Sequence, residues 1–219
     1  MAPTYTLSLA TEADIPGILE VWLAAWPESP LTAKAFPRTE AVREWITVAY
    51  RQHMEETTST VLVVTADEDG TRGSVVSFAL LFREGAPDGD EKESGTNGGV
   101  RKWQSRWVRG RGLAEGMNEE VLGANLFVPM DRQHEKIMGS RRHIFLEVLG
   151  THPDHQRKGF ASRMLEWSSE RADREGLEIY LDASAKGKPL YEKYGFRGQE
   201  DLMDAETKSV PMLRPKANA

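Results

Sequence analysis

The chain has 219 residues, 39% hydrophobic and 28% charged, which predicts one globular domain and leaves little room for two. The absence of cysteine excludes disulfides, thiolate metal sites and a cysteine nucleophile. The formal net charge of −6 argues against a general attraction to nucleic acid or anionic lipid, and with no signal-peptide pattern and no long apolar segment we expect a cytoplasmic protein.

A strand and then a helix are predicted at the start of the chain. Residues 4–9 alternate in the manner of a short strand, and Thr11, followed by acidic residues, is a suitable helix cap. Apolar residues then recur at helical spacing as far as Trp26. Pro27 and Pro30 end this run, because proline does not continue a helix.

A second helix and a β-hairpin are predicted next. The helical pattern covers about residues 40–53. Two segments rich in Val, Leu and Phe, 58–65 and 74–82, flank the acidic turn 67–70. This arrangement is typical of two antiparallel strands joined by a tight turn.

An insertion is predicted at about residues 84–112. Residues 84–99 contain five glycines, five acidic residues and no aromatic residue, so they bury too little apolar surface to hold one conformation, and we expect them to be mobile. Residues 101–111 carry five basic residues and two tryptophans. This pattern can bind nucleic acid, but in an acidic chain we favour a surface segment, or a tether whose tryptophans pack on the core.

The C-terminal half predicts an inserted helical segment and two buried strands. The helical segment covers about residues 118–138, with Pro129 as a break. The run 144–149 is apolar apart from Glu147, which is typical of a strand in the middle of a sheet. Residues 177–183 repeat this pattern after another helix, so we expect a parallel βαβ unit.

A candidate anion site, Gln156 to Ala161, follows the first of these strands. Glycine at 159 lets a bound group approach the backbone, and the free N–H groups of a helix's first turn carry partial positive charge that suits a phosphate. An ordinary tight turn is the alternative. A dinucleotide-binding loop fits badly, because Gly150 and Gly159 are the only glycines there and the Gly-x-Gly-x-x-Gly spacing is missing.

A second motif, residues 190–196, reads Leu-Tyr-Glu-Lys-Tyr-Gly-Phe. The proline before it and the glycine within it bound a short helix. Leu190 and Tyr194 can face the core, which turns Tyr191 toward a neighbouring surface. Periodicity alone is equally consistent with Tyr191 as an ordinary packed tyrosine.

The two motifs together resemble the acetyl-CoA-binding core of the GNAT superfamily of N-acetyltransferases, over about residues 143–196. The resemblance implies a single α/β (α+β) domain over 1–219. It further implies a mixed central sheet of about seven strands flanked by helices, with strands 4 and 5 splayed to admit the pantetheine arm. Acetyl-CoA is the implied co-substrate, and no metal is implied. Two departures from the family pattern are Ala161, where glycine is more frequent, and the insertion.

The resemblance also implies roles for particular residues. Leu149, Gly150 and Thr151 would offer main-chain groups to the pantetheine arm. Tyr191 falls where the family often has a tyrosine that protonates the departing CoA thiolate, and Ser184, just before the short helix, would also contact the cofactor. The residues expected at the pyrophosphate are Gln156, Arg157, Lys158, Gly159, Phe160, Ala161 and Ser162.

An amine acceptor requires a general base, because an alkylamine is only about one part in a thousand neutral at pH 7. Glu147 is our candidate, since a carboxylate in an apolar strand should have a raised pKa. The alternatives for Glu147 are pairing with a neighbouring arginine or exposure to solvent. His143, His152 and His155 are rival bases, of which the last two lie in the loop.

Aromatic residues in and after the first helix predict the acceptor pocket. Trp26 and Phe36 are the candidates for substrate binding, together with Trp22. Tryptophans at helical spacing are more often simply core residues. The insertion is a further candidate for shaping this pocket.

The predicted activity is transfer of an acetyl group from acetyl-CoA to a primary amine of a small molecule, by direct attack in a ternary complex. The alternatives are a non-catalytic CoA-binding regulatory module and an O-acetyltransferase. We expect no nucleic-acid or membrane partner, and a homodimer is expected at the level of the family only.

Overall fold

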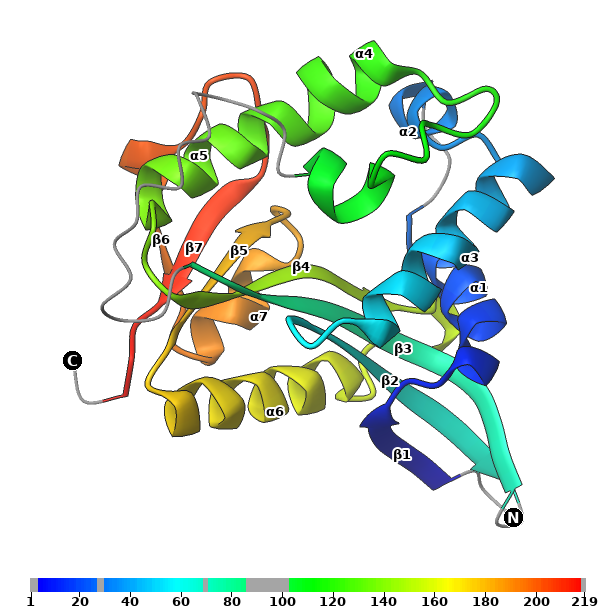
Figure 1. The fold of residues 1–219 in the computed structure, drawn as a ribbon. Helices are drawn as coiled ribbons and strands as arrows, with labels where there is room; N and C mark the ends of the chain where they lie inside the picture. The colour runs from blue at the N-terminus through cyan, green and yellow to red at the C-terminus, as the bar shows by residue number, and fades with distance from the viewer. Residues whose placement is uncertain (1–3, 27–29, 69–70, 86–102, 218–219) are drawn as a thin grey trace.

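The computed structural model describes residues 4–26, 30–68, 71–85 and 103–217. In this part of the chain a mixed sheet of seven strands forms the centre of the fold, in the order β1-β2-β3-β4-β5-β7-β6 (Figure 1). The strands are β1 (Thr4–Leu9), β2 (Ser59–Glu68), β3 (Thr71–Glu84), β4 (His143–Thr151), β5 (Glu178–Ala183), β6 (Arg197–Gly198) and β7 (Val210–Arg214). The prediction of a mixed sheet of about seven strands is confirmed.

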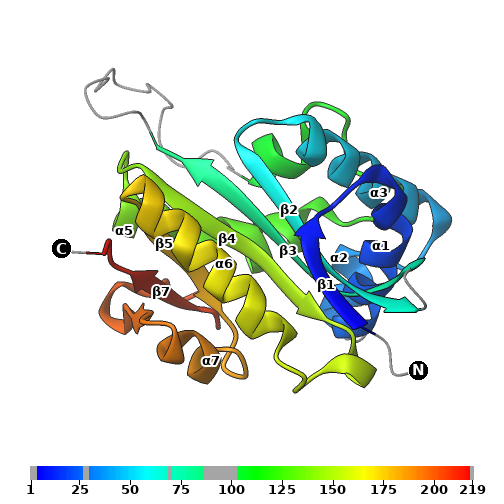
Figure 2. The same cartoon turned by 90° about the horizontal axis from the view of Figure 1, so that it is seen from below.

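Helices cover both faces of this sheet. The α-helices are α1 (Ile15–Ala25), α2 (Pro30–Ala35), α3 (Glu40–Glu55), α4 (Glu119–Leu122), α5 (Val128–Met138), α6 (Phe160–Glu175) and α7 (Lys188–Lys193). α6 runs across one face (Figure 2), while α1, α3, α4 and α5 lie on the other (Figure 1). Each face of the sheet carries its own apolar core. We call the face that α6 covers the α6 face, and the opposite face the α1 face.

Most elements lie where the residue patterns predict them. β1 spans the predicted strand, α1 ends before Pro27, and β2 and β3 form the predicted antiparallel hairpin. α2 is an element that the sequence reading missed. Pro30 stands at its first position, where proline is compatible with a helix because the N–H it lacks would have no helical partner.

The predicted helix over 118–138 is divided into three parts. α4 is followed by a π-helical turn, Gly123–Phe127, and α5 then begins with Pro129 in its first turn. The break predicted at Pro129 is not observed, because the backbone stays helical through Phe127 and Val128 and α5 carries Pro129 in its first turn. The π-helical turn accommodates Pro129, because the hydrogen bonds of a π-helix span five residues and the turn does not require an i to i−4 bond at every residue.

The predicted insertion falls largely on residues 86–102, which lie outside the described residues, so its mobility stays a prediction. Both flanks are described: Glu84 ends β3, and a π-helical turn, Gln104–Val108, follows the insertion. Trp103 and Trp107 are buried in the core of the α1 face. The tryptophans thus pack as the tether interpretation predicts.

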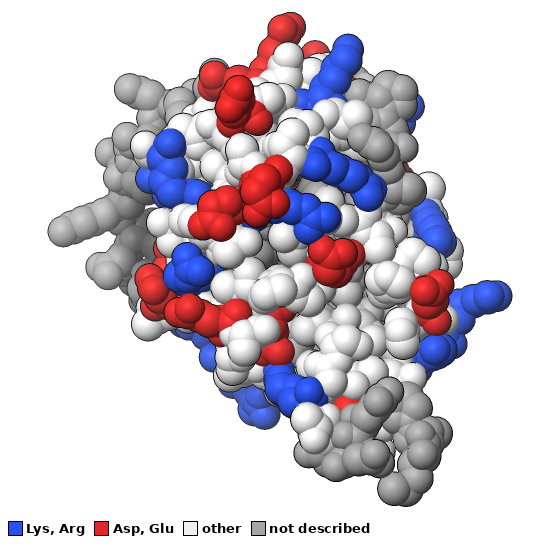
Figure 3. All heavy atoms as spheres, turned by 90° about the vertical axis from the view of Figure 1, so that its right-hand side faces the viewer, with Lys and Arg blue, Asp and Glu red and all other residues white. Residues whose placement is uncertain are grey.

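The described basic residues of this flank have partners inside the protein. Arg109 bonds Glu56 and the Nδ1 atom of His53, and Arg111 donates to the carbonyl oxygens of Trp45 and Trp107. Arg106 is buried. These guanidinium groups are therefore committed to internal contacts. On the face of the molecule seen in Figure 3, acidic and basic side chains are interspersed.

β4 and β5 separate after a short parallel pairing. His143, Ile144 and Phe145 pair with Glu178, Ile179 and Tyr180, and no further pair joins the two strands. β4 nevertheless continues to Thr151, paired with β3 on its other edge, and β5 continues to Ala183, paired with β7. The predicted splay of strands 4 and 5 is confirmed.

Among the described helices, none combines the length and the apolar character that a membrane crossing requires.

Candidate active site

The loop after β4 presents backbone N–H groups at the start of α6. Gly159 has φ of +85°, a conformation that favours glycine, and a Cβ built there would meet nothing within 4 Å. The first helical bond runs from the Arg163 N–H to the Gly159 oxygen, so the N–H groups of residues 160–162 precede the helical ladder. This is the geometry that an anion needs at a helix N-terminus.

The side chains of the loop divide into three groups. Phe160 is 3% exposed and packs on Tyr5 with ring centroids 4.6 Å apart, which anchors the helix start and leaves only the Phe160 backbone for a ligand. Arg157 and Lys158 are exposed, and Ala161 and Ser162 are half-buried. Among the residues expected at the pyrophosphate, basic side chains and free amides therefore come together.

Gln156 closes the loop onto the end of β4. Its Nε2 atom donates to the Thr151 oxygen at 3.3 Å, and its Oε1 atom accepts from Lys186 Nζ at 3.4 Å. Lys186 was not predicted as a site residue. It lies between β5 and α7, and only the folded chain brings its charge to the loop.

Gly150 is required by the packing of aromatic rings on the α1 face. A Cβ at this position would lie 2.9 Å from Phe78 and 3.0 Å from Trp26. The Gly150 oxygen accepts a 2.7 Å bond from the Ser77 hydroxyl. Trp26, an expected acceptor contact, therefore packs directly on the strand segment expected to hold the pantetheine arm. Leu149 packs instead on the core of the α6 face.

The residues expected beyond β5 surround α7. The Ser184 hydroxyl accepts a bond from the Gly187 N–H at 3.1 Å, which orders the approach to the helix. Tyr191 packs on the α6 face, with its ring centroid 5.8 Å from that of Phe196. Burial raises the pKa of Tyr191 to about 12. The phenol therefore stays protonated at neutral pH and can donate a proton.

A cavity of about 210 Å³ opens on the α1 face. Trp26 and Phe36 both line it, and so does Glu147. Trp22 also lines the wall, with its ring centroid 5.0 Å from that of Phe36. The cavity thus has an aromatic wall and a carboxylate on β4.

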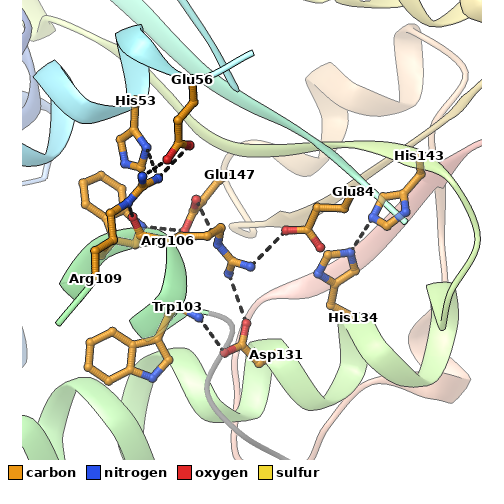
Figure 4. A network of polar contacts seen from close by, with 11 residues as sticks. His53, Glu56, Glu84, Trp103, Arg106, Arg109, Asp131, His134, His143 and Glu147 are labelled. Atoms are coloured by element: carbon orange, nitrogen blue, oxygen red, sulfur yellow. Dashed lines mark hydrogen bonds and ion pairs between the residues drawn. The ribbon is translucent and has the colours of Figure 1, made fainter. Parts of the chain in front are cut away.

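Glu147 is tied to the π-helical turn after the insertion. Trp107 Nε1 donates to Glu147 Oε1 at 2.7 Å. Arg106 Nε lies 3.3 Å from Glu147 Oε2 (Figure 4). Burial raises the pKa of Glu147, while the Arg106 charge and the Trp107 bond act against this rise. The pairing with an arginine, one of the alternatives for Glu147, is therefore present, and it occurs in the wall of the cavity.

Arg106 also holds two other carboxylates. Its guanidinium lies 3.0 Å from Glu84 and 3.1 Å from Asp131 (Figure 4). Within the described residues, one buried cation therefore faces three acidic side chains, which together carry more charge than this cation when all three are ionised. Such a site favours a bound cation or a proton.

Asp182 is a further carboxyl group of the cavity wall. Its Oδ1 atom accepts bonds from the Tyr180 hydroxyl, at 2.8 Å, and from Gln133 Nε2. Burial raises the pKa of Asp182 to about 7, with a further rise from the charge of Asp131. The two hydrogen bonds and Arg106 oppose this rise.

The three histidines proposed as rival bases lie elsewhere. His143 is buried, and its Nδ1 donates to the Arg141 carbonyl at 2.7 Å while its Nε2 lies 2.7 Å from His134 Nε2. Ligand atoms of Glu84, His134 and His143 lie within 4.8 Å of one another, a set that could hold a metal ion. His152 and His155 lie in the loop and do not line the cavity.

Sequence reasoning missed several residues of the cavity wall: Arg106, Trp107, Asp131, His134 and Asp182. For Asp182 a signal was present, because it is an acidic residue in an apolar strand, as Glu147 is. For Arg106 and Asp131 no local signal exists, since their roles depend on contacts between segments that are distant in the sequence.

Comparisons with known proteins agree with this geometry. Residues 107–198 match the family model described as an acetyltransferase (GNAT) domain. This range contains the split between β4 and β5, the loop before α6, and α7.

Solved structures with the same fold span the whole chain. A Corynebacterium glutamicum structure, described as histone acetyltransferase HPA2 and related acetyltransferase, is 20% identical, with a TM-score of 0.58 and coverage of 100% of this chain and 99% of that one. PaiA N-acetyltransferase from Thermoplasma acidophilum, in complex with coenzyme A, is 13% identical, with a TM-score of 0.54 and coverage of 97% and 99%. Arylalkylamine N-acetyltransferase 2 from Aedes aegypti is 14% identical, with a TM-score of 0.60 and coverage of 98% and 100%. At these identities the likeness shows the fold alone, and the match of residues 107–198 to the GNAT domain model agrees with that fold.

Proposed function

We propose that the protein transfers the acetyl group of acetyl-CoA to a primary amine of a small molecule, by direct attack in a ternary complex. One observation carries the proposal: the pairing of β4 with β5 ends at Phe145 and Tyr180, beside a cavity with aromatic and acidic walls. An opening between the strands suits the slender pantetheine arm. The adjoining cavity suits an acceptor.

The donor site would use the loop, the strand edge and α7. Backbone amides of residues 159–162, with Arg157 and Lys158 nearby, would bind the pyrophosphate. The edge of β4 that faces the opening would offer main-chain groups from Leu149, Gly150 and Thr151 to the arm. Ser184 and Lys186 follow β5, the strand on the other side of the opening. These residues would fix the thioester near the cavity and so lower the entropic cost of the reaction.

The transfer forms a C–N bond to the acceptor and breaks the C–S bond of the thioester. The acceptor nitrogen loses a proton to a carboxylate of the cavity, for which Glu147 is the candidate from the sequence, directly or through a water. Tyr191, protonated at neutral pH, would give its proton to the departing thiolate. Tyr191 packs on the α6 face and Glu147 on the α1 face, so the two proton transfers would occur on opposite sides of the opening.

A thiol-release assay with a thermal-shift measurement tests the proposal. Acetyl-CoA should raise the Tm, and CoA thiol should be released in amounts that match an acetylated amine in a panel of primary amines and alcohols. A raised Tm without thiol release from any acceptor would favour the non-catalytic CoA-binding module. Release with alcohols alone would favour an O-acetyltransferase.

A further inference from the structure

Two carboxyl groups line the cavity just beyond the last pair between β4 and β5. The last pair of the parallel register joins Phe145 to Tyr180, whose rings lie on the cavity side with centroids 5.8 Å apart. Glu147 and Asp182 each lie two residues beyond this pair, and Glu147 stands at a β-bulge where the pairing of β4 with β3 passes from Leu146 to Val148. Both side chains line the cavity.

The two carboxyl groups differ in what holds them. Glu147 has a cation beside one oxygen and an indole donor on the other, at 3.3 Å and 2.7 Å. Within the described residues, Asp182 receives both of its hydrogen bonds on Oδ1 and none on Oδ2. Asp182 therefore has an oxygen that can meet an incoming ammonium group, whereas a proton on Glu147 would disturb the pairing with Arg106.

The donors that hold Asp182 are themselves fixed. Gln133 is 1% exposed, and its Oε1 accepts from the Asp204 N–H at 3.0 Å. Tyr180 is completely buried. Two immobile donors on one oxygen orient the carboxyl plane, so that Oδ2 keeps a fixed direction. Such orientation by neighbouring groups is what a proton acceptor requires.

From this geometry we propose that Asp182, on β5, is the group that takes the proton from the acceptor amine, while Glu147 with Arg106 forms the charged wall beside it. The inference deepens the proposed function and rests on it. The first proton moves from the ammonium to Asp182 Oδ2 before the neutral nitrogen attacks the thioester carbonyl, and it passes to solvent after the acetylated product leaves. The second proton, which the nitrogen loses as the C–S bond breaks, balances the proton that Tyr191 gives to the thiolate.

The charged surroundings of Asp182 set its proton affinity near neutrality. Burial is the largest effect and raises its pKa to about 7. β7 places the uncharged Pro211 opposite Asp182 in the register. The other ionisable groups of the cavity wall are Arg38 between α2 and α3, Arg106 in the turn Gln104–Val108, Asp131 and His134 on α5, and Glu147 on β4.

The test compares Asp182→Asn with the wild type on 2-phenylethylamine, a probe chosen for the aromatic wall of the cavity. Asparagine keeps an oxygen for Tyr180 and Gln133 but cannot take a proton. We expect kcat/KM at pH 7 to fall by about 10² to 10⁴, with the acetyl-CoA thermal shift retained. Asp201→Asn, on an exposed turn, is the matched control and should retain wild-type kinetics.

The pH profile separates a proton acceptor from a merely structural carboxyl group. In the wild type, kcat/KM should rise through pH of about 7 as Asp182 loses its proton. In Asp182→Asn this limb should vanish, and the rate should keep rising toward the pKa of the free amine, about 10. Tyr180→Phe removes a donor that stabilises the carboxylate, so it should move the limb to higher pH.

Each outcome decides the inference. An Asp182→Asn rate within about threefold of wild type, with Glu147→Gln strongly impaired, would overturn it. If Asp182→Asn does not fold, an unmoved limb in Tyr180→Phe would overturn it, and a limb at higher pH would support it. If the wild-type enzyme releases no thiol with any amine, the proposed function has failed, and the inference fails with it. If only the Asp182→Asn variant loses activity, the turnover of the wild type still supports the proposed function.

Discussion

The indole of Trp107 donates a 2.7 Å hydrogen bond to Glu147, which joins the segment after the insertion to the strand that borders the opening. Trp107 also stacks on Trp45 of α3, with centroids 6.4 Å apart. The insertion flank is thus a wall of the cavity, held by one charged hydrogen bond and by ring packing. This relationship makes Trp107 a suitable site for the first prediction.

Replacing Trp107 by Phe should destabilise the protein by about 2 to 3 kcal/mol, because a buried carboxylate loses its hydrogen-bond donor and the ring becomes smaller. The same change should raise the pKa of Glu147 further, since the Trp107 bond now opposes the rise. Chemical denaturation measures the first effect. Trp167→Phe, on the half-buried face of α6, is the control, and equal losses in the two variants would contradict the assigned bond.

Replacing Arg106 by Met should be more damaging. Removing one partner of a buried ion-pair cluster typically costs about 3 to 5 kcal/mol, here because Glu84, Asp131 and Glu147 lose their shared cation. Arg132→Met removes a guanidinium that is 45% exposed and paired with Asp204, so it should cost less than about 1 kcal/mol. Similar losses in the two variants would show that the Arg106 cluster is not the stabilising feature proposed.

The stability of Arg106→Met should also depend on pH. Without the cation, the folded-state pKa of Glu147, which burial already raises, rises further above its unfolded value. The contribution of Glu147 to stability is then present at low pH and is lost as the pH rises through the raised pKa. The free energy of unfolding should therefore fall more steeply than in the wild type as the pH rises above the ordinary range of a carboxyl group. Parallel curves for variant and wild type would contradict this explanation.

The fold could be predicted largely from the sequence, because its elements depend on local patterns. β1, the hairpin, β4, α6 and β5 all follow from periodicity and turn residues. α2 was missed because prolines usually end helices, and the π-helical turn Gly123–Phe127 was missed because one extra residue per turn hardly changes the apolar pattern. The splay of β4 from β5 came from the family resemblance, since no residue pattern encodes it.

The candidate site could be predicted only in part. The glycine loop and Tyr191 have local signatures, and Glu147 is conspicuous as an acid in an apolar strand. Asp182 carries the same signature and could have been selected with Glu147. Arg106 could not, because its partners come from three segments that are distant in the sequence and meet only in the folded protein.

Substituting Gly150 by Ala should disturb the acceptor side of the site. The added methyl would lie 2.9 Å from Phe78 and 3.0 Å from Trp26, so a ring must move. We expect a loss of about 1 to 3 kcal/mol from overpacking, and a KM for the amine that rises more than the KM for acetyl-CoA. Gly123→Ala is the control, since a Cβ there meets nothing within 4 Å. An unchanged amine KM in Gly150→Ala would contradict the role of Trp26.

Tyr191→Phe tests the proton donor on the α6 face. Because the ring remains, packing on Phe196 should persist and the Tm should change little. The loss of the phenol should lower kcat by about 10² to 10⁴ while leaving the thermal shift with acetyl-CoA nearly unchanged. Tyr194→Phe, whose hydroxyl meets Glu166 on the surface, is the matched control. Full turnover in Tyr191→Phe would remove this residue from the mechanism.

A crystal structure of the protein with bound CoA is the most direct test of the account. We expect the pantetheine arm in the opening between β4 and β5, bonded to main-chain groups of residues 149–151, with the pyrophosphate on the amides of residues 159–162. CoA bound elsewhere, or β4 and β5 paired beyond Phe145 and Tyr180 with no space for the arm, would contradict it.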